Sequence, residues 1–185
     1  MDPKLKKILF ISNLSTIALI LVGFGIWWYI FNSQFAAIEN DAYGIKMKYP
    51  RGWQAVKNYE GTALAFVSPK ESPMDVFKEN VNVVVQDMSA HPMELKEFVD
   101  TSINQMSKVF KNIIVVESKP TKAANINAQK IVFEAQEPDQ LKIMVVCFLQ
   151  DNKAYIITYA ARSFKYDYYY NLVDTMVKSL TISGN

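Results

Sequence analysis

The longest apolar stretch of the chain lies near its N-terminus, between Ile8 and Phe31, where no charged residue occurs. At about 1.5 Å of rise per residue, a helix of this length crosses a hydrocarbon core of about 30 Å with some tilt. Trp27, Trp28 and Tyr29 gather at its far end, and aromatic rings prefer the headgroup level of a bilayer. The pattern predicts a transmembrane helix over residues 8–31.

Charges on the two sides of this segment predict its orientation. Lys4, Lys6 and Lys7 precede it, whereas the first basic residue after it is Lys46. Because basic residues stay on the cytoplasmic side, residues 1–7 are predicted to be a cytoplasmic tail, and the rest of the chain to be periplasmic or otherwise extracytoplasmic. No small-x-small cleavage pattern follows the apolar stretch, so we expect the helix to remain as a single-pass anchor.

After a short linker, residues 32–42, the apolar positions change to the spacing of β-strands. Ile45, Met47 and Tyr49 alternate with lysines, as a half-buried strand requires. The run 143–149 is almost continuously apolar, which is typical of a central strand covered on both faces. Strands are predicted over residues 43–50, 53–56, 62–67, 80–87, 113–119, 127–134, 141–150 and 153–161, with a hairpin turn at Asp151-Asn152.

Two segments have the 3.6-residue spacing of amphipathic helices. The first is expected to begin around Ser89 to Pro92, because proline is favoured near a helix start. Its apolar stripe is Leu95, Phe98, Val99, Ile103, Met106 and Phe110. The second covers about residues 165–179, with Tyr169, Leu172, Val173, Met176, Val177 and Leu180 on its stripe. Strands, a helix, more strands and a helix predict an α+β domain over residues 43–185, with an antiparallel sheet between helical layers.

The charge of the chain belongs to its N-terminus. The formal net charge is +2, and the three lysines that precede the apolar stretch, against Asp2, already supply it. The remaining residues are therefore neutral overall, whereas nucleic-acid-binding proteins concentrate lysine and arginine on one face. We expect no nucleic-acid partner.

The residue types that carry catalysis are scarce. His91 is the only histidine, which excludes histidine-rich zinc sites, and Cys147 lies in an apolar run where an inert buried thiol is expected. Glu94 and Glu97 fit the dipole of a helix start. We expect no enzyme and no cofactor, and we assign no metal ligands. The one candidate partner surface lies in the tyrosine run, where Tyr166 and Tyr170 are expected to point away from the apolar stripe.

The domain resembles the PsbP family, named for an extrinsic subunit of the oxygen-evolving complex, together with related bacterial proteins. The resemblance covers about residues 43–182. The residues that carry it are Gly44-Ile45-Lys46-Met47-Lys48-Tyr49-Pro50-Arg51-Gly52-Trp53, Phe66-Val67-Ser68-Pro69, Asn80-Val81-Asn82-Val83-Val84-Val85, Tyr155-Ile156-Ile157-Thr158-Tyr159-Ala160, Phe164, and Met176-Val177-Lys178-Ser179-Leu180. The resemblance implies an αβα sandwich around a central antiparallel sheet and a non-catalytic role in assisting a membrane complex.

Unlike the photosynthetic members, this chain has a predicted permanent helix. This difference argues against a role in photosystem II itself. We therefore expect a membrane-anchored accessory subunit or assembly factor, which docks on the extracytoplasmic face of a larger membrane protein complex. A pilin-like structural subunit is one alternative, although the basic-glycine processing site followed by glutamate is absent. The other is a domain that binds a small ligand or a metal in a pocket on the sheet.

Overall fold

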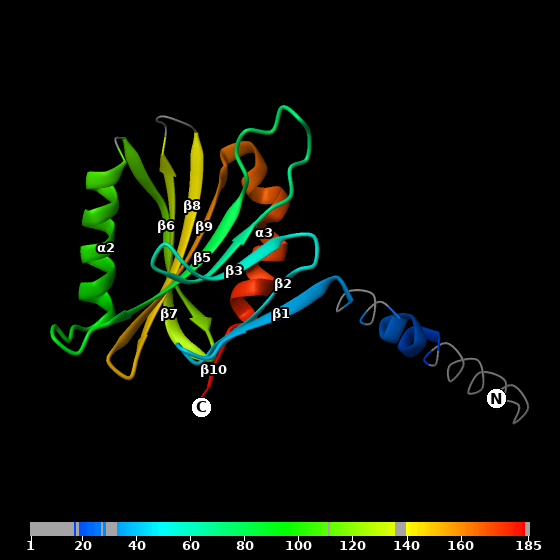
Figure 1. The fold of residues 1–185 in the computed structure, drawn as a ribbon, viewed down its shortest axis with the longest axis horizontal. Coiled ribbons are helices and arrows are strands. Elements are labelled where there is room, and N and C mark those ends of the chain that lie inside the picture. Colours follow the sequence, from blue (N-terminus) through cyan, green and yellow to red (C-terminus); the bar gives the residue numbers. More distant parts are fainter. Residues whose placement is uncertain are drawn as a thin grey trace, which may run out of the picture. The chain divides into compact units, whose positions relative to one another are not determined.

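A computed structural model describes most of the chain (Figure 1). The chain forms two compact units, Met1–Ala36 and Ala37–Asn185, which are described separately. In the first unit, the described residues within the predicted membrane segment are helical, and the rest of that segment lies outside the described residues. Within the described part of the chain, no helix is both long and apolar enough to cross a membrane. The described residues are Ile17, 19–26, Trp28, 33–110, 112–135 and 140–183.

The second unit is built on a seven-stranded sheet with the order β3-β4-β5-β9-β8-β7-β6, in which every neighbouring pair is antiparallel. This confirms the predicted α+β class with an antiparallel sheet. The strands are β3 (Gln54–Tyr59), β4 (Thr62–Val67), β5 (Asn80–Asp87), β6 (Ile113–Ala123), β7 (Ile126–Ala135), β8 (Leu141–Gln150) and β9 (Lys153–Arg162).

Two helices, α2 (Leu95–Val109) and α3 (Ser163–Lys178), lie on opposite sides of this sheet (Figure 1). Under α2, a cluster of buried side chains includes Ile143, Val145 and Cys147 of β8, and Phe98 packs into it from the helix. Because side chains alternate along a strand, the intervening residues of β8 are buried on the α3 side. β8 is therefore a central strand covered on both faces, as its continuous apolar run predicted.

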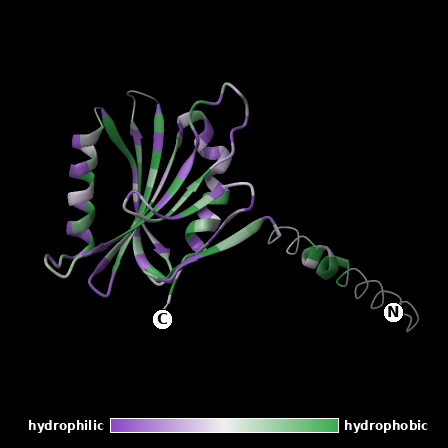
Figure 2. Cartoon of the chain, viewed as in Figure 1, coloured by the Kyte–Doolittle hydropathy of each residue, from purple (hydrophilic) through white to green (hydrophobic). Residues whose placement is uncertain are grey.

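The apolar stripe predicted for α2 is confirmed, but its predicted start is wrong. Phe98 and Val99 are buried, and the other stripe residues pack against the same cluster. The helix begins only after Glu94, which has extended backbone angles. Met93 packs against the same cluster. The segment between β5 and α2 therefore already lies on this face of the sheet before the helix begins. Figure 2 shows hydrophilic and hydrophobic residues mixed along α2, as an amphipathic helix requires.

A second sheet, of three strands, was only partly predicted. It has the order β1-β2-β10, with β1 (Phe35–Asn40), β2 (Ile45–Pro50) and β10 (Thr181–Ile182). The expected linker, residues 32–42, is thus corrected, because it contains β1. β10 was missed because its two residues become a strand only by pairing with β2, where Thr181 lies opposite Lys46.

Tight turns explain two of the sequence signals. Trp53 donates its backbone N–H to the Pro50 carbonyl at 2.9 Å, and its buried ring meets Tyr169 of α3 edge-on, with ring centroids 5.5 Å apart. The Pro-x-x-Trp sequence therefore forms the turn after β2 and packs that turn against α3. Asp151 and Asn152 both have positive φ, 52° and 56°, as the two central residues of a type I′ hairpin require, which confirms the predicted β8–β9 turn.

Candidate functional site

A polar cleft of about 370 Å³ lies between α3 and the strands β6, β7 and β8. The strand register brings its charged residues onto one face, because Lys119 lies directly opposite Lys130, and Glu134 lies opposite Lys142. Its full lining is Val116, Glu117, Lys119, Lys130, Val132, Glu134, Lys142, Tyr166, Asp167 and Tyr170. The cleft therefore contains both residues of the predicted partner surface, Tyr166 and Tyr170.

Lys130 is the most deeply placed cation of the cleft, with only 8% of the residue exposed. Its Nζ atom lies 2.7 Å from Oε1 of Glu117, donates to the hydroxyl oxygen of Tyr170 at 3.2 Å, and stands 5.4 Å from the Tyr170 ring centroid. Burial alone lowers the pKa of Lys130, but the hydrogen bonds and charges of Glu117 and Tyr170 outweigh it and raise the pKa. The ammonium group therefore stays charged.

One side-chain oxygen of Glu117 forms ion pairs with two lysines. Besides Lys130, the Nζ atom of Lys119 lies 3.2 Å from its Oε1 atom. The hydrogen bond from Lys130 is the main cause that lowers the pKa of the carboxyl group, and Lys119 adds to it against the opposing effect of burial. Glu117 is therefore a fixed carboxylate, which holds Lys130 in place.

Tyr166 does not point away from the core, so that prediction is wrong. Only 3% of the residue is exposed, and its backbone carbonyl accepts the Tyr159 hydroxyl at 3.0 Å. Its own hydroxyl is buried and has no hydrogen-bond partner among the described residues, and burial is the main cause that raises its pKa. Lys142 Nζ lies over its ring, 4.7 Å from the centroid. Tyr166 is buried because it lies on the side of α3 that packs against the sheet. Tyr170 is half-buried at the cleft.

The inward position of Lys130 was missed, although the sequence carries a signal for it. Ala128, Lys130 and Val132 alternate along β7 and so share one face of the strand, and both neighbours of the lysine are buried. A lysine between two inward-facing apolar residues requires a carboxylate partner. Glu117 could not be identified as that partner, because its position depends on the β6–β7 register, which includes an irregularity between Val115 and Glu117.

The chemistry of the described residues favours binding. Cys147 is fully buried, and burial raises the pKa of its thiol to about 11, so it stays protonated and inert. Among the described residues, no group of three or more histidine, cysteine, aspartate or glutamate side chains could hold a metal ion. The cleft offers fixed charges of both signs beside tyrosine rings, which is an arrangement that recognises charged groups.

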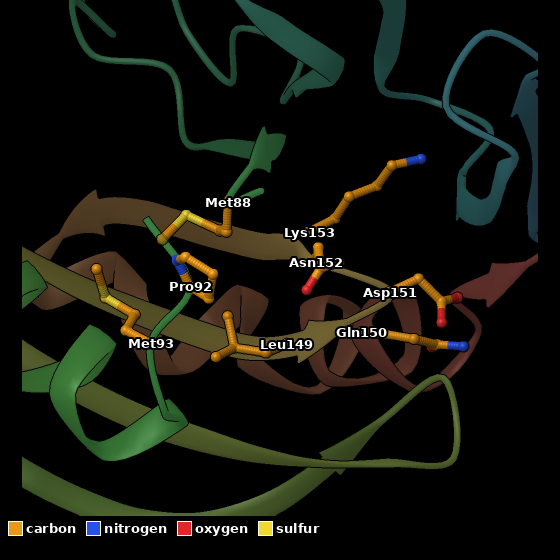
Figure 3. A pocket seen from close by; sticks show the side chains of 8 residues that line it. All are labelled: Met88, Pro92, Met93, Leu149, Gln150, Asp151, Asn152 and Lys153. Atoms are coloured by element: carbon orange, nitrogen blue, oxygen red, sulfur yellow. The ribbon is translucent and has the colours of Figure 1, made fainter. Parts of the chain in front are cut away.

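Two further hollows have different linings. One, of about 180 Å³, lies between the segment that precedes α2 and the β8–β9 turn; Figure 3 shows Pro92 between Met88 and Met93, with Lys153 extending away. The other, of about 510 Å³, lies on β3, β4 and β5. Neither lining brings two carboxylates together among the described residues.

The predicted membrane-interface residues fall in the first unit. Trp28 is described: it is 56% exposed, and its ring stacks on Phe24 with centroids 6.4 Å apart. The others, Lys4, Lys6, Lys7, Trp27 and Tyr29, lie outside the described residues.

The fold defines an α+β sandwich in which an antiparallel sheet has one helix on each face. The chain belongs to the PsbP-like family, whose profile, described as PsbP-like protein, matches residues 31–182. The match confirms the resemblance drawn from the sequence. No curated protein matches the chain.

Solved structures of low sequence identity share this fold. Cyanobacterial PsbP (CyanoP) from Synechocystis sp. PCC 6803 is 13% identical, with a TM-score of 0.60 over 80% of this chain and 92% of that one. PA94 of Pseudomonas aeruginosa, a protein of unknown function described as a putative regulator, is 12% identical, with a TM-score of 0.58 over 82% and 99%. The Ran-binding protein Mog1p of Saccharomyces cerevisiae is 10% identical, with a TM-score of 0.59 over 80% and 95%.

Proposed function

We propose that this chain is a membrane-anchored, non-catalytic accessory subunit or assembly factor, whose extracytoplasmic domain docks on a larger membrane protein complex. The observation that carries the proposal is the exposure of apolar side chains in the first unit. They are exposed by 54–73%: Ile17, Leu19, Ile20, Leu21, Val22, Phe24, Ile26 and Trp28. In the described part of this segment the exposed side chains are all apolar, and a helix with such a surface is stabilised by lipid or by another apolar helix.

The orientation follows from the flanking charges. Lys4, Lys6 and Lys7 stand before the apolar stretch, and Glu39 and Asp41 follow it before the first basic residue, Lys46. By the positive-inside rule, this distribution supports an orientation with the N-terminus in the cytoplasm and the domain on the outer side. A tether of this kind raises the effective concentration of a weakly docking domain.

The non-catalytic role is supported by the protonation states in the cleft. A general acid or base works best with a pKa near the working pH. In this cleft the pKa of Glu117 is lowered, whereas the pKa values of Lys130 and Tyr166 are raised, each away from neutrality. Among the similar structures, Mog1p is named as a Ran-binding protein, which agrees with a binding role for this fold.

The test is the behaviour of the full-length protein in isolated membranes. We expect it to stay in the pellet after alkaline carbonate extraction, and protease added from outside to digest the domain and leave a short N-terminal fragment. Replacing Lys4, Lys6 and Lys7 by glutamate should reduce the fraction with the domain outside. Full release by carbonate would contradict the anchor. A domain that protease digests only after the membrane is opened with detergent, in cells whose outer envelope has been removed, would contradict the orientation.

A further inference from the structure

The cleft between α3 and the strands β6, β7 and β8 contains hydroxyl donors that the described residues leave unused. The Tyr166 hydroxyl is buried and bonds to none of them. Tyr170 accepts a hydrogen bond from Lys130, but its own hydroxyl hydrogen has no acceptor in the described part of the chain. Electrostatic interaction with Tyr170 and Glu117 adds to burial in raising the pKa of Tyr166, which places its hydroxyl near these two cleft residues.

The ammonium group of Lys142 also lacks a hydrogen bond with the described residues. Its Nζ atom lies 3.9 Å from Oε1 of Glu134, which is beyond hydrogen-bonding distance, and 4.7 Å from the centroid of the Tyr166 ring. Because a lysine side chain is flexible, Lys142 can turn from this ring towards a bound group. Its ammonium group and the tyrosine hydroxyls can then donate to the same carboxylate.

Three carboxylates line the same cleft and balance its three lysines. Glu117 is already held by two of these lysines. Glu134 is 46% exposed, and its ion pair with Lys142 is the long one of 3.9 Å. Asp167 of α3 is exposed and forms no ion pair within the described part of the chain. The cleft therefore offers hydrogen-bond donors and carboxylate acceptors to one ligand.

Other classes of ligand fit this lining poorly. A phosphate or another polyanion would bring its charge beside Glu134 and Asp167, and like charges disfavour binding. A sugar or a nucleobase would stack on an aromatic face. The Tyr166 ring already packs against Tyr159, with centroids 5.1 Å apart, and Lys142 lies over it.

We propose that this cleft binds a small zwitterion of the amino-acid class, with its carboxylate on Lys142 and the Tyr166 hydroxyl and its ammonium group beside Asp167. As Lys142 turns to the carboxylate, Glu134 is left to face the ammonium group as well. Charge-assisted hydrogen bonds at both ends select a molecule that carries both groups close together. The cleft volume of about 370 Å³ suits a small ligand. Such a site goes beyond the docking role and does not depend on the membrane anchor.

The test is ligand binding to the full-length protein in mild detergent, measured by the thermal midpoint and by titration calorimetry. The probes are the standard amino acids, one by one, at about 10 mM. We expect at least one of them to raise the midpoint in a saturable way. Its methyl ester and its N-acetyl derivative, which each lack one charge, should bind about tenfold more weakly or worse. No shift with any amino acid, or equally tight binding of acetate, methylammonium or inorganic phosphate, would overturn the proposal.

Variants show which residue holds each end of the ligand. Lys142→Met should weaken binding of the amino acid by about tenfold but leave binding of its methyl ester nearly unchanged, because the ester has no carboxylate. Asp167→Asn should likewise weaken the amino acid and spare the N-acetyl derivative. Lys57→Met on β3 and Asp100→Asn on α2 are matched controls at exposed positions and should change neither affinity. Equal effects of Lys142→Met and Lys57→Met would overturn the proposal.

Tyr166→Phe is a second variant, which tests the site if Lys142→Met does not fold. It removes only the buried hydroxyl and should keep the thermal midpoint of the protein without ligand. We expect it to weaken binding of the amino acid by about fivefold or more, because a hydrogen bond to a carboxylate is lost. An unchanged affinity would show that the ligand lies elsewhere and would refute the site.

Discussion

The Nζ atom of Lys130 lies 2.7 Å from Oε1 of Glu117, and the two side chains hold together β7, β6 and, through Tyr170, helix α3. The lysine side chain is 10% exposed and that of the glutamate 36%, so solvent screens only part of their attraction. Removing one charge leaves the other in a partly buried position without its main partner, which costs more than removing both.

Glu117→Gln should therefore lower the free energy of unfolding by about 1–2 kcal/mol, and Lys130→Met by less, because an apolar side chain suits the site. The measurement is urea unfolding. Asp100→Asn is the matched control, since its pair with Lys96 has the same 2.7 Å separation but is exposed, and it should change nothing measurable. Equal effects of Glu117→Gln and Asp100→Asn would contradict the role of burial.

The ion pair of Lys130 and Glu117 also predicts that the free energy of unfolding depends on pH. The pKa of Glu117 is lowered in the folded protein, so its contribution to stability is present above its usual value of 4.5 and is lost as the pH falls through the folded pKa. The difference in unfolding free energy between the parent and Glu117→Gln should therefore shrink below pH 4.5. A difference that grows on acidification would have the wrong sign.

Two tyrosines that face each other predict opposite responses to loss of a hydroxyl. Tyr166→Phe removes a buried hydroxyl for which the described part of the chain offers no partner, so the stability should be unchanged or rise by up to about 1 kcal/mol. Tyr159→Phe removes the 3.0 Å hydrogen bond to the Tyr166 carbonyl and should cost about 1–2 kcal/mol. Chemical denaturation of the two variants measures both changes. A larger loss of stability for Tyr166→Phe than for Tyr159→Phe would show that the Tyr166 hydroxyl is hydrogen-bonded.

Local patterns in the sequence predicted most of the main sheet and both of its helices. The β8–β9 hairpin follows from Asp151-Asn152, whose side chains tolerate positive φ. The stripe of α2 follows from helical spacing alone. These features are set by residues near one another in the chain, so no knowledge of the tertiary structure was needed.

Features that depend on distant segments were missed. β10 exists because Thr181 pairs with Lys46, at the other end of the domain. The burial of Tyr166 depends on how α3 lies against the sheet, and the partner of Lys130 depends on the β6–β7 register. The exposed side chains of Met74, Val76, Phe164 and Tyr168 come from a loop and from the first turns of α3, and helical spacing alone does not predict both.

Cys147 should be unreactive in the folded protein. Burial raises the pKa of its thiol to about 11, and its sulfur lies 3.8 Å from the Gln129 carbonyl, which it can donate to. At mildly alkaline pH we expect a thiol reagent to modify the native protein only as fast as it opens, and to react completely in urea. Stoichiometric labelling of the native protein within minutes would contradict this burial.

The native size of the protein in mild detergent tests the central claim most directly. The 185 residues have a mass of 21.1 kDa, and at native expression levels we expect the protein to leave the membrane in a complex several times larger, together with other proteins. A protein that migrates as a lone monomer in several mild detergents would contradict the accessory role.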